Sequence, residues 1–364
     1  MGAPVIAQHV TLRNFRSYDS LELALEPGLV LVTGDNGVGK TNLLEAVHVG
    51  SQGFSPRTRA DVRLIRFGEE AARVSLAGAE GGAPVETQVD LRSGRNKEVR
   101  LNGAALGSAE ELRLRLSALA FTPDRLAVVK GGPIVRRAYF DRMIGRLFPA
   151  RAGLPVEYGR ALAQRNAALR RVRAREAPRD IVAPWTQQVA QLGSELDLRR
   201  SELVARLAKR FRERGALLGL RDAELAYENA GLTLEDLDAR FTADVERGTT
   251  GAGPHLRDVR VTSGGRELRG YGSQGEQRSA VLALVVAEGD LAAAERNVPP
   301  LLLLDDVFSE LDEGRRRALV ADLPSGSQTL VTMTDRRVYP PGGPEPSLVV
   351  AVWRQEETSV AQAA

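Results

Sequence analysis

Eight residues near the N-terminus have the composition and spacing of a phosphate-binding loop. Gly34–Thr41 reads Gly-Asp-Asn-Gly-Val-Gly-Lys-Thr and matches G-x-x-x-x-G-K-S/T at each fixed position. Glycines in such a loop let backbone N–H groups surround phosphates, the lysine reaches the β- and γ-phosphates, and the threonine hydroxyl binds Mg²⁺. The pattern predicts a nucleoside triphosphate site with Lys40 and Thr41 as its key side chains. The residues expected to contact the nucleotide from this loop are Gly34, Asp35, Asn36, Gly37, Val38, Gly39, Lys40, Thr41 and the following Asn42.

Two adjacent carboxylates late in the chain suit the same chemistry. Asp305 and Asp306 directly follow the apolar run Leu301–Leu304, which is typical of a buried strand. In P-loop enzymes an aspartate at this position orders the Mg²⁺ shell, so we expect Asp305 and Thr41 on the metal. Asp306 is then placed to orient or deprotonate the attacking water. The alternative is that one of the two acids merely caps the next turn.

The segment Gly270–Ser279 is rich in glycine and polar residues and precedes the apolar run Ala280–Ala287. Ser273 and Glu276 have the spacing of a helix-capping box. A helix N-terminus capped by serine also offers free N–H groups and a positive dipole end to an anion. The segment therefore predicts either an ordinary helix start or a second phosphate-binding element.

The elements around these residues follow from their periodicity. We expect strands at Val5–Phe15, Leu21–Leu25, Leu29–Thr33, Leu301–Leu304 and Gln328–Thr332, and helices at Gly39–Val49 and Glu313–Leu323. Residues 74–106 look extended, with a turn at Asn102-Gly103. From Pro133 to Leu220 the pattern is helical, and Tyr158–Ala177 with Trp185–Arg214 predicts an antiparallel helical hairpin. The tail after Arg354 is expected to be loose.

Composition bounds the class of protein. The 364 residues include 27% charged and 43% apolar side chains, the balance of a globular protein, and no cysteine. The longest apolar runs are much shorter than the roughly 20 residues of a membrane span, and no signal peptide is visible, so we expect a cytoplasmic protein that does not enter membranes. The net charge is +3, yet the pI is about 9.4 because arginine greatly outnumbers lysine.

The motifs occur in the order found in ABC-type ATPases of chromosome maintenance, and in detail they resemble the RecF family of bacterial recombinational-repair ATPases. The similarity covers nearly the whole chain. The motifs that carry it are Asn14–Tyr18, Gly34–Ala46, Phe121–Asp124, Val129–Pro133 with Arg136-Arg137 and Phe140-Asp141, Ser273–Ser279 and Leu303–Asp312. The resemblance implies an α/β fold: an ABC-type P-loop ATPase head with a β-rich ATPase lobe, a second, mainly helical lobe and no long coiled coil. It places the ATPase lobe at residues 1–122 and 297–364 and the helical lobe at residues 123–296.

By this resemblance, Ser273, Gln274, Gly275 and Glu276 belong to the signature motif that contacts the γ-phosphate held by a second subunit. Ser309–Asp312 matches the D-loop of the same interface, and Asn14 and Arg16 match positions near the adenine and ribose. The family implies ATP and Mg²⁺ as cofactors, an ATP-dependent homodimer, and binding to double-stranded and gapped DNA. It also implies partnership with RecR and RecO in loading recombinase onto single-strand gaps.

Several positions depart from the wider ATPase pattern. Thr122 stands where SMC-type heads carry the Q-loop glutamine, and Asp306 replaces a catalytic glutamate, so we expect slow hydrolysis. Thr334 lies near the position of the switch histidine. His255 lies in a second stretch similar to the family, where Leu256 interrupts its usual sequence, and we assign it no chemistry.

A basic face on the helical segment would supply affinity for DNA backbone without sequence preference. Its candidates are Arg165, Arg170, Arg171, Arg173, Arg175, Arg199 and Arg200. In a chain this rich in arginine, solvated helix faces are an equal explanation. The competing hypothesis is an ATPase subunit that powers a nuclease or transporter partner.

Overall fold

The computed structural model describes residues 6–309, 311–324 and 326–364, and the chain in it divides into two compact units. Unit 1 comprises Met1–Leu126, Glu213–Arg221 and Gly272–Ala364, and unit 2 comprises Ala127–Arg212 and Asp222–Tyr271. These bounds differ from those expected for the helical lobe, because residues 123–126, 213–221 and 272–296 group with unit 1. The signature segment thus shares a unit with the phosphate loop.

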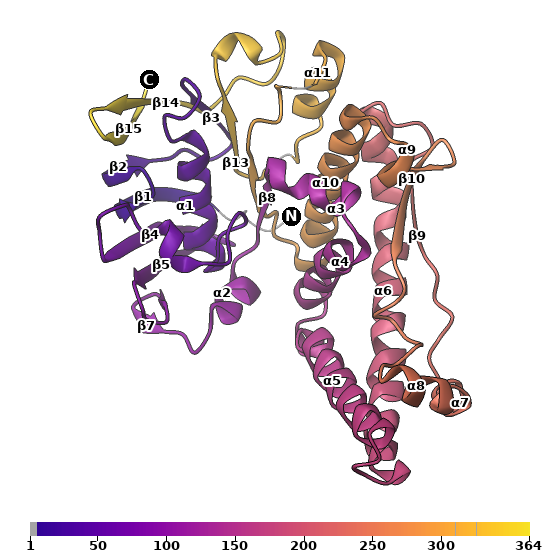
Figure 1. Cartoon of the computed structure of the whole chain (residues 1–364). Helices are drawn as coiled ribbons and strands as arrows, with labels where there is room; N and C mark the ends of the chain where they lie inside the picture. The colour runs from indigo at the N-terminus through magenta and orange to yellow at the C-terminus, as the bar shows by residue number, and fades with distance from the viewer. Residues whose placement is uncertain (1–5, 310, 325) are drawn as a thin grey trace. The chain divides into compact units, whose positions relative to one another are not determined.

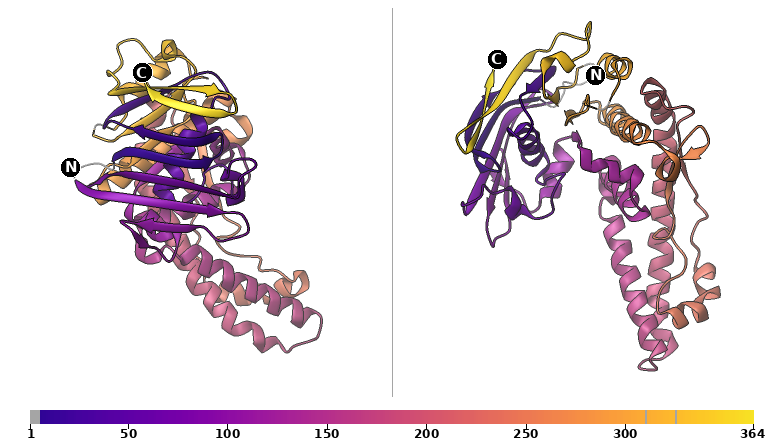
Figure 2. Two further views of the ribbon diagram at one scale, coloured as in Figure 1. Left: turned by 90° about the vertical axis from the view of Figure 1, so that its left-hand side faces the viewer. Right: turned by 45° about the horizontal axis from the view of Figure 1, so that its top comes forward.

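One of the two large sheets of unit 1 is antiparallel throughout. Its strands, in spatial order, are β2 (Tyr18–Ala24), β1 (Ile6–Phe15), β4 (Ala71–Glu80), β5 (Ala83–Arg92), β6 (Glu98–Leu101) and β7 (Ala104–Ala105). They form the stack of ribbons seen in the left view of Figure 2. Alternating apolar and polar residues place one face of β1 and β2 in the core. The predicted early hairpin and the turn at Asn102-Gly103, where both residues have positive φ, are confirmed.

The second sheet carries the phosphate loop and the acidic strand. Its strands are β15 (Thr358–Ala363), β14 (Leu348–Gln355), β3 (Leu29–Thr33), β13 (Thr329–Met333), β12 (Leu301–Leu304) and β8 (Ala118–Phe121). All except β15 pair in parallel. The strands β8, β12 and β13 are buried at every residue, as expected of parallel strands covered on both faces. Parallel pairing brings their carboxyl ends, and the residues that follow, to one edge.

The C-terminal tail corrects a prediction. Thr358–Ala363 is not loose but forms β15, which pairs antiparallel with β14 through a turn at Glu356. Ser359 is buried, and its backbone N–H donates to the carbonyl of Ser17 at 2.8 Å. The segment is rich in small and polar residues, so its strand character comes from tertiary pairing rather than from its own pattern.

Helix α1 (Lys40–Gln52) packs against strands of both sheets (Figure 1). A Cβ at Gly50 would lie 2.5 Å from the Leu76 side chain of β4, so this glycine permits the close approach of helix and sheet. The other helices that lie wholly in unit 1 are α2 (Ala109–Arg115), α10 (Gln274–Arg296) and α11 (Glu313–Ala321). Most of α10 from Gln277 to Gly289 is buried, so the helix that begins at the signature segment is a core element of this unit.

Unit 2 is mainly helical, as predicted. Its elements are α3 (Ala127–Lys130), α4 (Pro133–Leu147), α5 (Leu154–Arg173), most of α6 (Ala183–Leu217), α7 (Leu234–Ala239), α8 (Phe241–Arg247), α9 (Leu268–Tyr271), and a small sheet of β9 (Glu224–Tyr227), β10 (Val259–Ser263) and β11 (Arg266–Glu267). The predicted helical hairpin is α5 with α6, which run side by side in both figures. Leu169 of α5 and Trp185 of α6 pack in one apolar cluster.

Buried ion pairs in unit 2 correct part of the predicted basic face. Arg165 is fully buried, and its Nη1 donates to Asp244 Oδ2 at 2.8 Å. Arg200 is also buried and bonds both oxygens of Asp141 at 2.8 and 2.9 Å. Removing one partner would leave an uncompensated buried charge at a cost of about 3–5 kcal/mol. These arginines are thus paired inside unit 2 and do not face solvent. Among the helices of the described ranges, none is both long and apolar enough to cross a bilayer.

Candidate active site

The phosphate loop connects the end of β3 to the start of α1, as its pattern predicts. Gly34 and Gly39 have backbone φ angles of 147° and 118°, which residues that carry a side chain rarely adopt. A Cβ at Gly34 would lie 2.1 Å from the carbonyl oxygen of Val352, and one at Gly39 would lie 2.5 Å from Ser359 Oγ. Glycine is required at both positions because β14 and β15 approach the loop closely.

Lys40 lies over the loop. Its Nζ donates to the carbonyl oxygens of Gly34 at 2.6 Å and Asp35 at 2.7 Å. Burial lowers the pKa of Lys40, and the negative charges of Asp306, Asp305 and Asp35 oppose that shift. The ammonium group is therefore surrounded by acceptors and carboxylates, and it can transfer these contacts to phosphate oxygens.

A hydrogen bond joins the phosphate loop to the acidic strand end. Thr41 Oγ1 donates to Asp305 Oδ1 at 2.9 Å, and Thr332 Oγ1 donates to the same oxygen at 2.8 Å. Burial raises the pKa of Asp305, and the two threonine hydroxyls oppose that shift. The two residues predicted to hold the metal are therefore adjacent, although they lie 264 positions apart in sequence.

Asp306 has an unusual backbone conformation that three contacts hold. Its φ is 50°, in the left-handed region, which aspartate tolerates better than most residues. Its N–H donates to Thr332 Oγ1 at 2.8 Å, and its carbonyl accepts from Arg278 Nη2 at 2.8 Å and Ser309 Oγ at 3.2 Å. Strained backbone that its surroundings over-determine is characteristic of functional sites. These hydrogen bonds use the backbone of Asp306 and not its carboxylate. The carboxylate lies near enough to Lys40 for its charge to raise the pKa of the lysine.

Thr332 belongs to the site although no sequence motif marks it. It lies in β13, whose Val331 pairs with Leu304 of β12, so Thr332 stands next to Asp305. In the sequence, Thr332 could have been found as a polar residue near the end of the strand that neighbours the acidic strand. Parallel strands end at one edge of a sheet, so residues at their ends lie close together.

Two other sequence candidates fall beside this edge. Thr334, near the expected position of the switch histidine, is exposed just beyond β13. Of the predicted D-loop, Glu310 lies outside the described residues, and Asp312 caps α11, with Oδ1 accepting from the N–H of Arg315 at 2.9 Å. The D-loop aspartate therefore has a structural task within its own chain.

The signature segment begins α10 with the predicted capping box. Ser273 Oγ accepts from the N–H of Glu276 at 3.2 Å, and the N–H and hydroxyl of Ser273 donate to Glu276 Oε2 at 2.8 and 2.9 Å. The hydrogen bond from the Ser273 N–H, and after it the bond from the Ser273 hydroxyl, lowers the pKa of Glu276. Within the described residues, no hydrogen bond joins Ser273, Gln274, Gly275 or Glu276 to the phosphate loop. Ser273 and Glu276 therefore bond each other at the start of α10.

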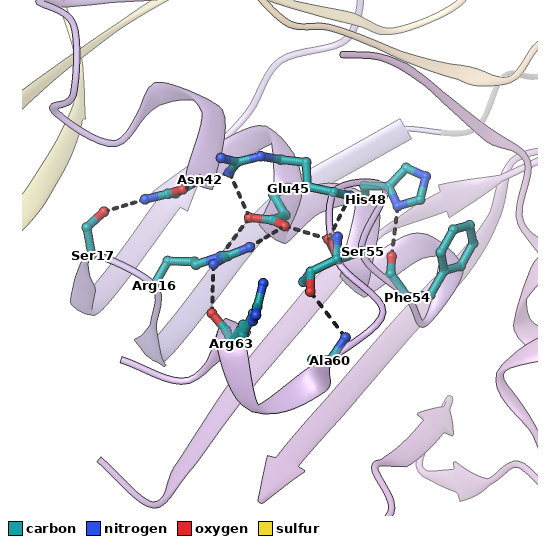
Figure 3. Close-up of polar contacts among 11 residues, drawn as sticks. Arg16, Ser17, Asn42, Glu45, His48, Phe54, Ser55, Ala60 and Arg63 are labelled. Atoms are coloured by element: carbon teal, nitrogen blue, oxygen red, sulfur yellow. Dashed lines mark hydrogen bonds and ion pairs between the residues drawn. The ribbon is translucent and has the colours of Figure 1, made fainter. Parts of the chain in front are cut away.

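Arg16, a predicted nucleotide contact, is held by a buried carboxylate on α1. Its Nε and Nη2 donate to the two oxygens of Glu45 at 2.9 and 2.8 Å, and its Nη1 donates to the carbonyl of Arg63 at 2.7 Å (Figure 3). Glu45 also accepts from Ser55 Oγ at 2.5 Å and Arg57 Nη1 at 3.2 Å. Glu45 is thus the centre of a network that fixes the guanidinium groups of Arg16 and Arg57, a role that was not predicted from the sequence.

Beside this network lies an open hollow of about 580 Å³. Asn42, the residue after Thr41, lines it and binds Ser17 Oγ through Nδ2 at 2.8 Å. The basic residues lining the hollow are Arg16, Arg57, Arg63, Arg66 and Arg354. One acidic residue, Glu357, also lines it. With five arginines and one glutamate, the hollow suits an anionic or hydrogen-bonding ligand that extends beyond the phosphate loop.

His255 belongs to a buried network of unit 2. Its Nδ1 is 2.7 Å from the hydroxyl of Tyr158, and its Nε2 is 3.1 Å from the carbonyl oxygen of Thr250. Because a carbonyl can only accept, Nε2 carries the hydrogen and Nδ1 of the neutral ring accepts from Tyr158. Burial lowers the pKa of His255, the charges of Arg137 and Arg200 add to that shift, and Thr250 and Asp244 oppose it. His255 is a structural residue in this geometry.

We expect stability to fall on acidification through His255. Its folded-state pKa lies below the unfolded value of about 6.5, so the unfolded chain binds the proton first. The stabilisation is fully present above pH 6.5 and is lost as pH falls from there through the folded pKa. Each tenfold difference in proton affinity between the folded and unfolded chains corresponds to about 1.4 kcal/mol. When Tm is measured between pH 8 and pH 5, it should fall less steeply with falling pH for His255→Gln than for wild type. An equal fall of Tm in both proteins would contradict this assignment.

Comparison with known proteins identifies relatives over nearly the whole chain. Residues 6–349 match the family described as RecF/RecN/SMC N terminal domain. A DNA replication and repair protein RecF from Anaeromyxobacter dehalogenans is 38% identical, covering 94% of this chain and 95% of that protein. The RecF of Heliobacterium modesticaldum is 34% identical, covering 92% and 94%.

Solved structures also match this chain over nearly its whole length. The recombination mediator protein RecF with ATP superposes with a TM-score of 0.87 at 25% identity, covering 100% of this chain and 99% of that one. The Smc head domain from Pyrococcus furiosus matches with a TM-score of 0.61 at 17% identity, covering 98% and 96%. The second match concerns the fold alone.

The fold and the site define a class: an ATPase head of the ABC and SMC type, with a phosphate loop, an acidic strand and a capped signature helix. The expected fold class is thereby confirmed. The relatives then settle the family. The chain belongs to the RecF family of DNA replication and repair ATPases.

Proposed function

We propose that this ATPase binds ATP with Mg²⁺, dimerises on DNA in an ATP-dependent manner, and leaves it after slow hydrolysis. In this cycle it helps to load recombinase at single-strand gaps together with RecO and RecR. The observation that carries the proposal is the Thr41–Asp305 hydrogen bond beside Lys40, which assembles the parts of a nucleotide site from distant segments. Two similar solved structures are described as RecF-ATPrS and RecF-ATP in the RecFOR pathway, which supports the ligand and the partners.

The residues present fit a Mg²⁺ ion. Asp305 and Thr41 offer two oxygen ligands at one point, and within the described residues no cluster of three or more acidic, histidine or cysteine side chains forms a metal cage. Mg²⁺ usually takes one or two carboxylates and completes its shell with waters and phosphate oxygens. When bound, the ion would neutralise charge on the phosphates. Thr41 and Asp305 would hold it.

Each side chain then has a defined task. Lys40 and the backbone N–H groups from Gly34 to Thr41 bind the phosphates, and Asp306 orients the attacking water. Arg16 and Asn42 border the hollow that would take the base and ribose. Because Glu45 fixes Arg16 through two bonds, the arginine would contact the ligand from a position already set.

The dimer is proposed from the signature segment. Ser273, Gln274 and Gly275 form the N-terminus of a helix that has no hydrogen bond to the loop of its own chain within the described residues. Glu276 holds the N–H and hydroxyl of Ser273, so a γ-phosphate from a second copy would compete with that carboxylate for them. A composite site of this kind makes ATP part of the interface.

DNA binding is proposed on the arginines of the helical hairpin that remain exposed. Arg170, Arg171, Arg173 and Arg175 lie at the end of α5 and just beyond it, and all four are exposed. Such a cluster binds phosphate backbone with a strong dependence on salt. The proposal places the protein in the cytoplasm, where it meets the nucleoid.

The proposal is tested by fluorescence anisotropy of labelled duplex and gapped DNA, with and without ATP and at two salt concentrations. We expect tighter binding with ATP and a loss of affinity at higher salt. Sedimentation in the same solutions should show dimers with ATP and monomers without it. Equal DNA affinity with and without ATP would contradict the proposed ATP-dependent cycle. It would favour an ATPase subunit that powers a separate partner.

We expect Lys40→Met to weaken ATP binding roughly tenfold to hundredfold, because hydrogen bonds from a charged donor contribute about 1.5–3 kcal/mol. ATP-dependent dimers should disappear at the same ATP concentration. Isothermal titration with ATP measures the first effect and sedimentation the second. Lys97→Met is the matched control, since Lys97 pairs with Asp61 at 3.1 Å and lies outside the site. Unchanged ATP affinity in Lys40→Met would exclude this loop as the phosphate site.

A further inference from the structure

Helix α5 ends at the tip of the helical hairpin in a Schellman motif (Figure 1). The N–H of Arg175 donates to the carbonyl of Val172 at 3.0 Å, and the N–H of Glu176 donates to the carbonyl of Arg171 at 2.9 Å. This pair of bonds places a left-handed residue at position 175, and Arg175 has a φ angle of 61°. The residue that turns the chain at the tip is therefore an arginine and not the usual glycine.

Arginine is an unfavourable choice for this conformation. In the left-handed region a Cβ lies too close to the following carbonyl oxygen, and glycine avoids that contact. Helix α6, the partner of α5 in the hairpin, ends in the same motif with Gly219 at the left-handed position, where φ is 78°. Strain that persists at a position with a standard alternative indicates a task for the side chain.

The tip also has an open hollow of about 690 Å³, which Arg175 lines. Arg173 and Arg179 line the same hollow, so three arginines reach it from one turn of the chain. The acidic residues Glu176 and Glu246 share its lining. Residues 170–180 contain five arginines and two acids, so the tip as a whole carries positive charge. A hollow of this charge suits an anionic group.

Two of the three arginines are held by other elements of unit 2. Arg173 Nη1 donates to the carbonyl of Arg247 at 3.3 Å, and the guanidinium carbon of Arg179 lies 5.0 Å from the centre of the Phe241 ring. Within the described parts of the chain, the Arg175 side chain makes neither a hydrogen bond nor an ion pair, and it is exposed. Contacts of this side chain within the protein therefore do not explain why arginine occupies the left-handed position.

We propose that the hairpin tip is a contact site for the phosphate backbone of DNA, with Arg175 as its central residue and Arg173 and Arg179 beside it. This inference rests on the proposed function, because it assigns the hollow and the strained turn to DNA binding. A guanidinium group binds phosphate oxygens through paired N–H donors and displaces counterions without reading the bases. The left-handed arginine lowers the stability of the free protein and contributes to binding only when DNA is present.

The test compares Arg175→Gly with wild type in the full-length protein. Fluorescence anisotropy of labelled duplex DNA, with and without ATP, measures affinity over a series of salt concentrations, and Tm is measured without DNA. We expect Tm to rise by about 1–3 °C, because glycine relieves the left-handed residue. DNA affinity at low salt should fall about threefold to tenfold for any duplex sequence. The slope of log affinity against log salt concentration should become shallower by about 0.9 for each tip in contact with DNA.

Two variants at the same position separate charge from strain. Arg175→Lys and Arg175→Ala both keep a side chain in the left-handed conformation, so the Tm of each should stay near that of wild type. The lysine should keep most of the DNA affinity, and the alanine should lose as much as glycine does. Arg95→Gly is the matched control for net charge, because Arg95 is exposed in the turn between β5 and β6 of unit 1. Its DNA affinity should equal that of wild type.

Unchanged DNA affinity and salt slope in Arg175→Gly would overturn the inference and would point to an acidic protein segment as the ligand of the tip. Equal losses in Arg175→Gly and Arg95→Gly would also overturn it, because net charge would then account for both. Wild type that binds no DNA would overturn both this inference and the proposed function. DNA binding that is independent of ATP, yet weakened in Arg175→Gly, would contradict the proposed cycle and support the contact site at the tip.

Discussion

Asp306→Asn should bind ATP and form ATP-dependent dimers as wild type does, while its ATP turnover falls about 10²–10⁴-fold. The amide has nearly the shape of the carboxylate but cannot accept a proton from water. The contacts that hold residue 306 come from its backbone, to Thr332, Arg278 and Ser309, so the substitution leaves them in place. Phosphate release measured in single-turnover conditions checks the rate, and sedimentation with ATP checks the dimer.

Asp306→Glu is the matched control for charge and reach. It retains the carboxylate and lengthens the side chain by one methylene, so we expect turnover to be kept or increased. If Asp306→Asn hydrolyses ATP as fast as wild type, Asp306 is not the residue that activates water. Loss of ATP binding in Asp306→Asn would indicate that the carboxylate acts in binding, since it also raises the pKa of the nearby Lys40.

Ser273→Arg should abolish ATP-dependent dimerisation while leaving ATP binding by the monomer intact. The substitution removes the hydroxyl that caps α10 and places a long side chain where a γ-phosphate from a second copy would bind. Loss of the cap costs about 1 kcal/mol, small beside the roughly 5–15 kcal/mol that hold a domain together, so the protein should fold. Sedimentation with ATP measures the dimer, and calorimetry measures binding.

Two further variants separate capping from anion binding at Ser273. Aspartate also caps helices, but its carboxylate would lie beside Glu276 Oε2, which accepts from the Ser273 hydroxyl at 2.9 Å, so Ser273→Asp should lose some stability. Its charge should also repel the γ-phosphate and prevent dimers. Thr233→Ala removes the equivalent cap of α7, where Thr233 Oγ1 accepts from the N–H of Asp236 at 3.1 Å, and should dimerise normally. Normal dimerisation by Ser273→Arg and Ser273→Asp would disprove a composite site.

Local patterns predicted the elements with strong signals. The strands at Leu29–Thr33 and Leu301–Leu304 have the predicted bounds because short, fully apolar runs admit few alternatives. The capping box at Ser273 and Glu276 was predictable because it depends on residues three positions apart. The strand β15 was missed because pairing with β14, and not its own composition, defines it.

The residues of the site also divide into those that a local pattern predicts and those that only tertiary contacts define. The phosphate loop was identifiable from spacing alone, since its backbone geometry demands glycine at fixed positions. The contributions of Thr332 and Glu45 depend on which strands and helices are neighbours, and a pattern along the chain does not contain that information. Equally, Arg165 and Arg200 looked like surface residues until their own burial and their partners, Asp244 and Asp141, were known.

By itself, the sequence determined the class of chemistry: a phosphate loop, an acidic strand end and a capped helix in a fixed order, each a short-range pattern that a few residue types must satisfy. The tertiary structure alone decided which side chains surround the acidic pair. Parallel pairing of β8, β12 and β13 brings residues from three distant segments to one edge, and α1 adds Thr41 and Glu45. Those contacts arise from packing between elements, which is why they appear only in the folded chain.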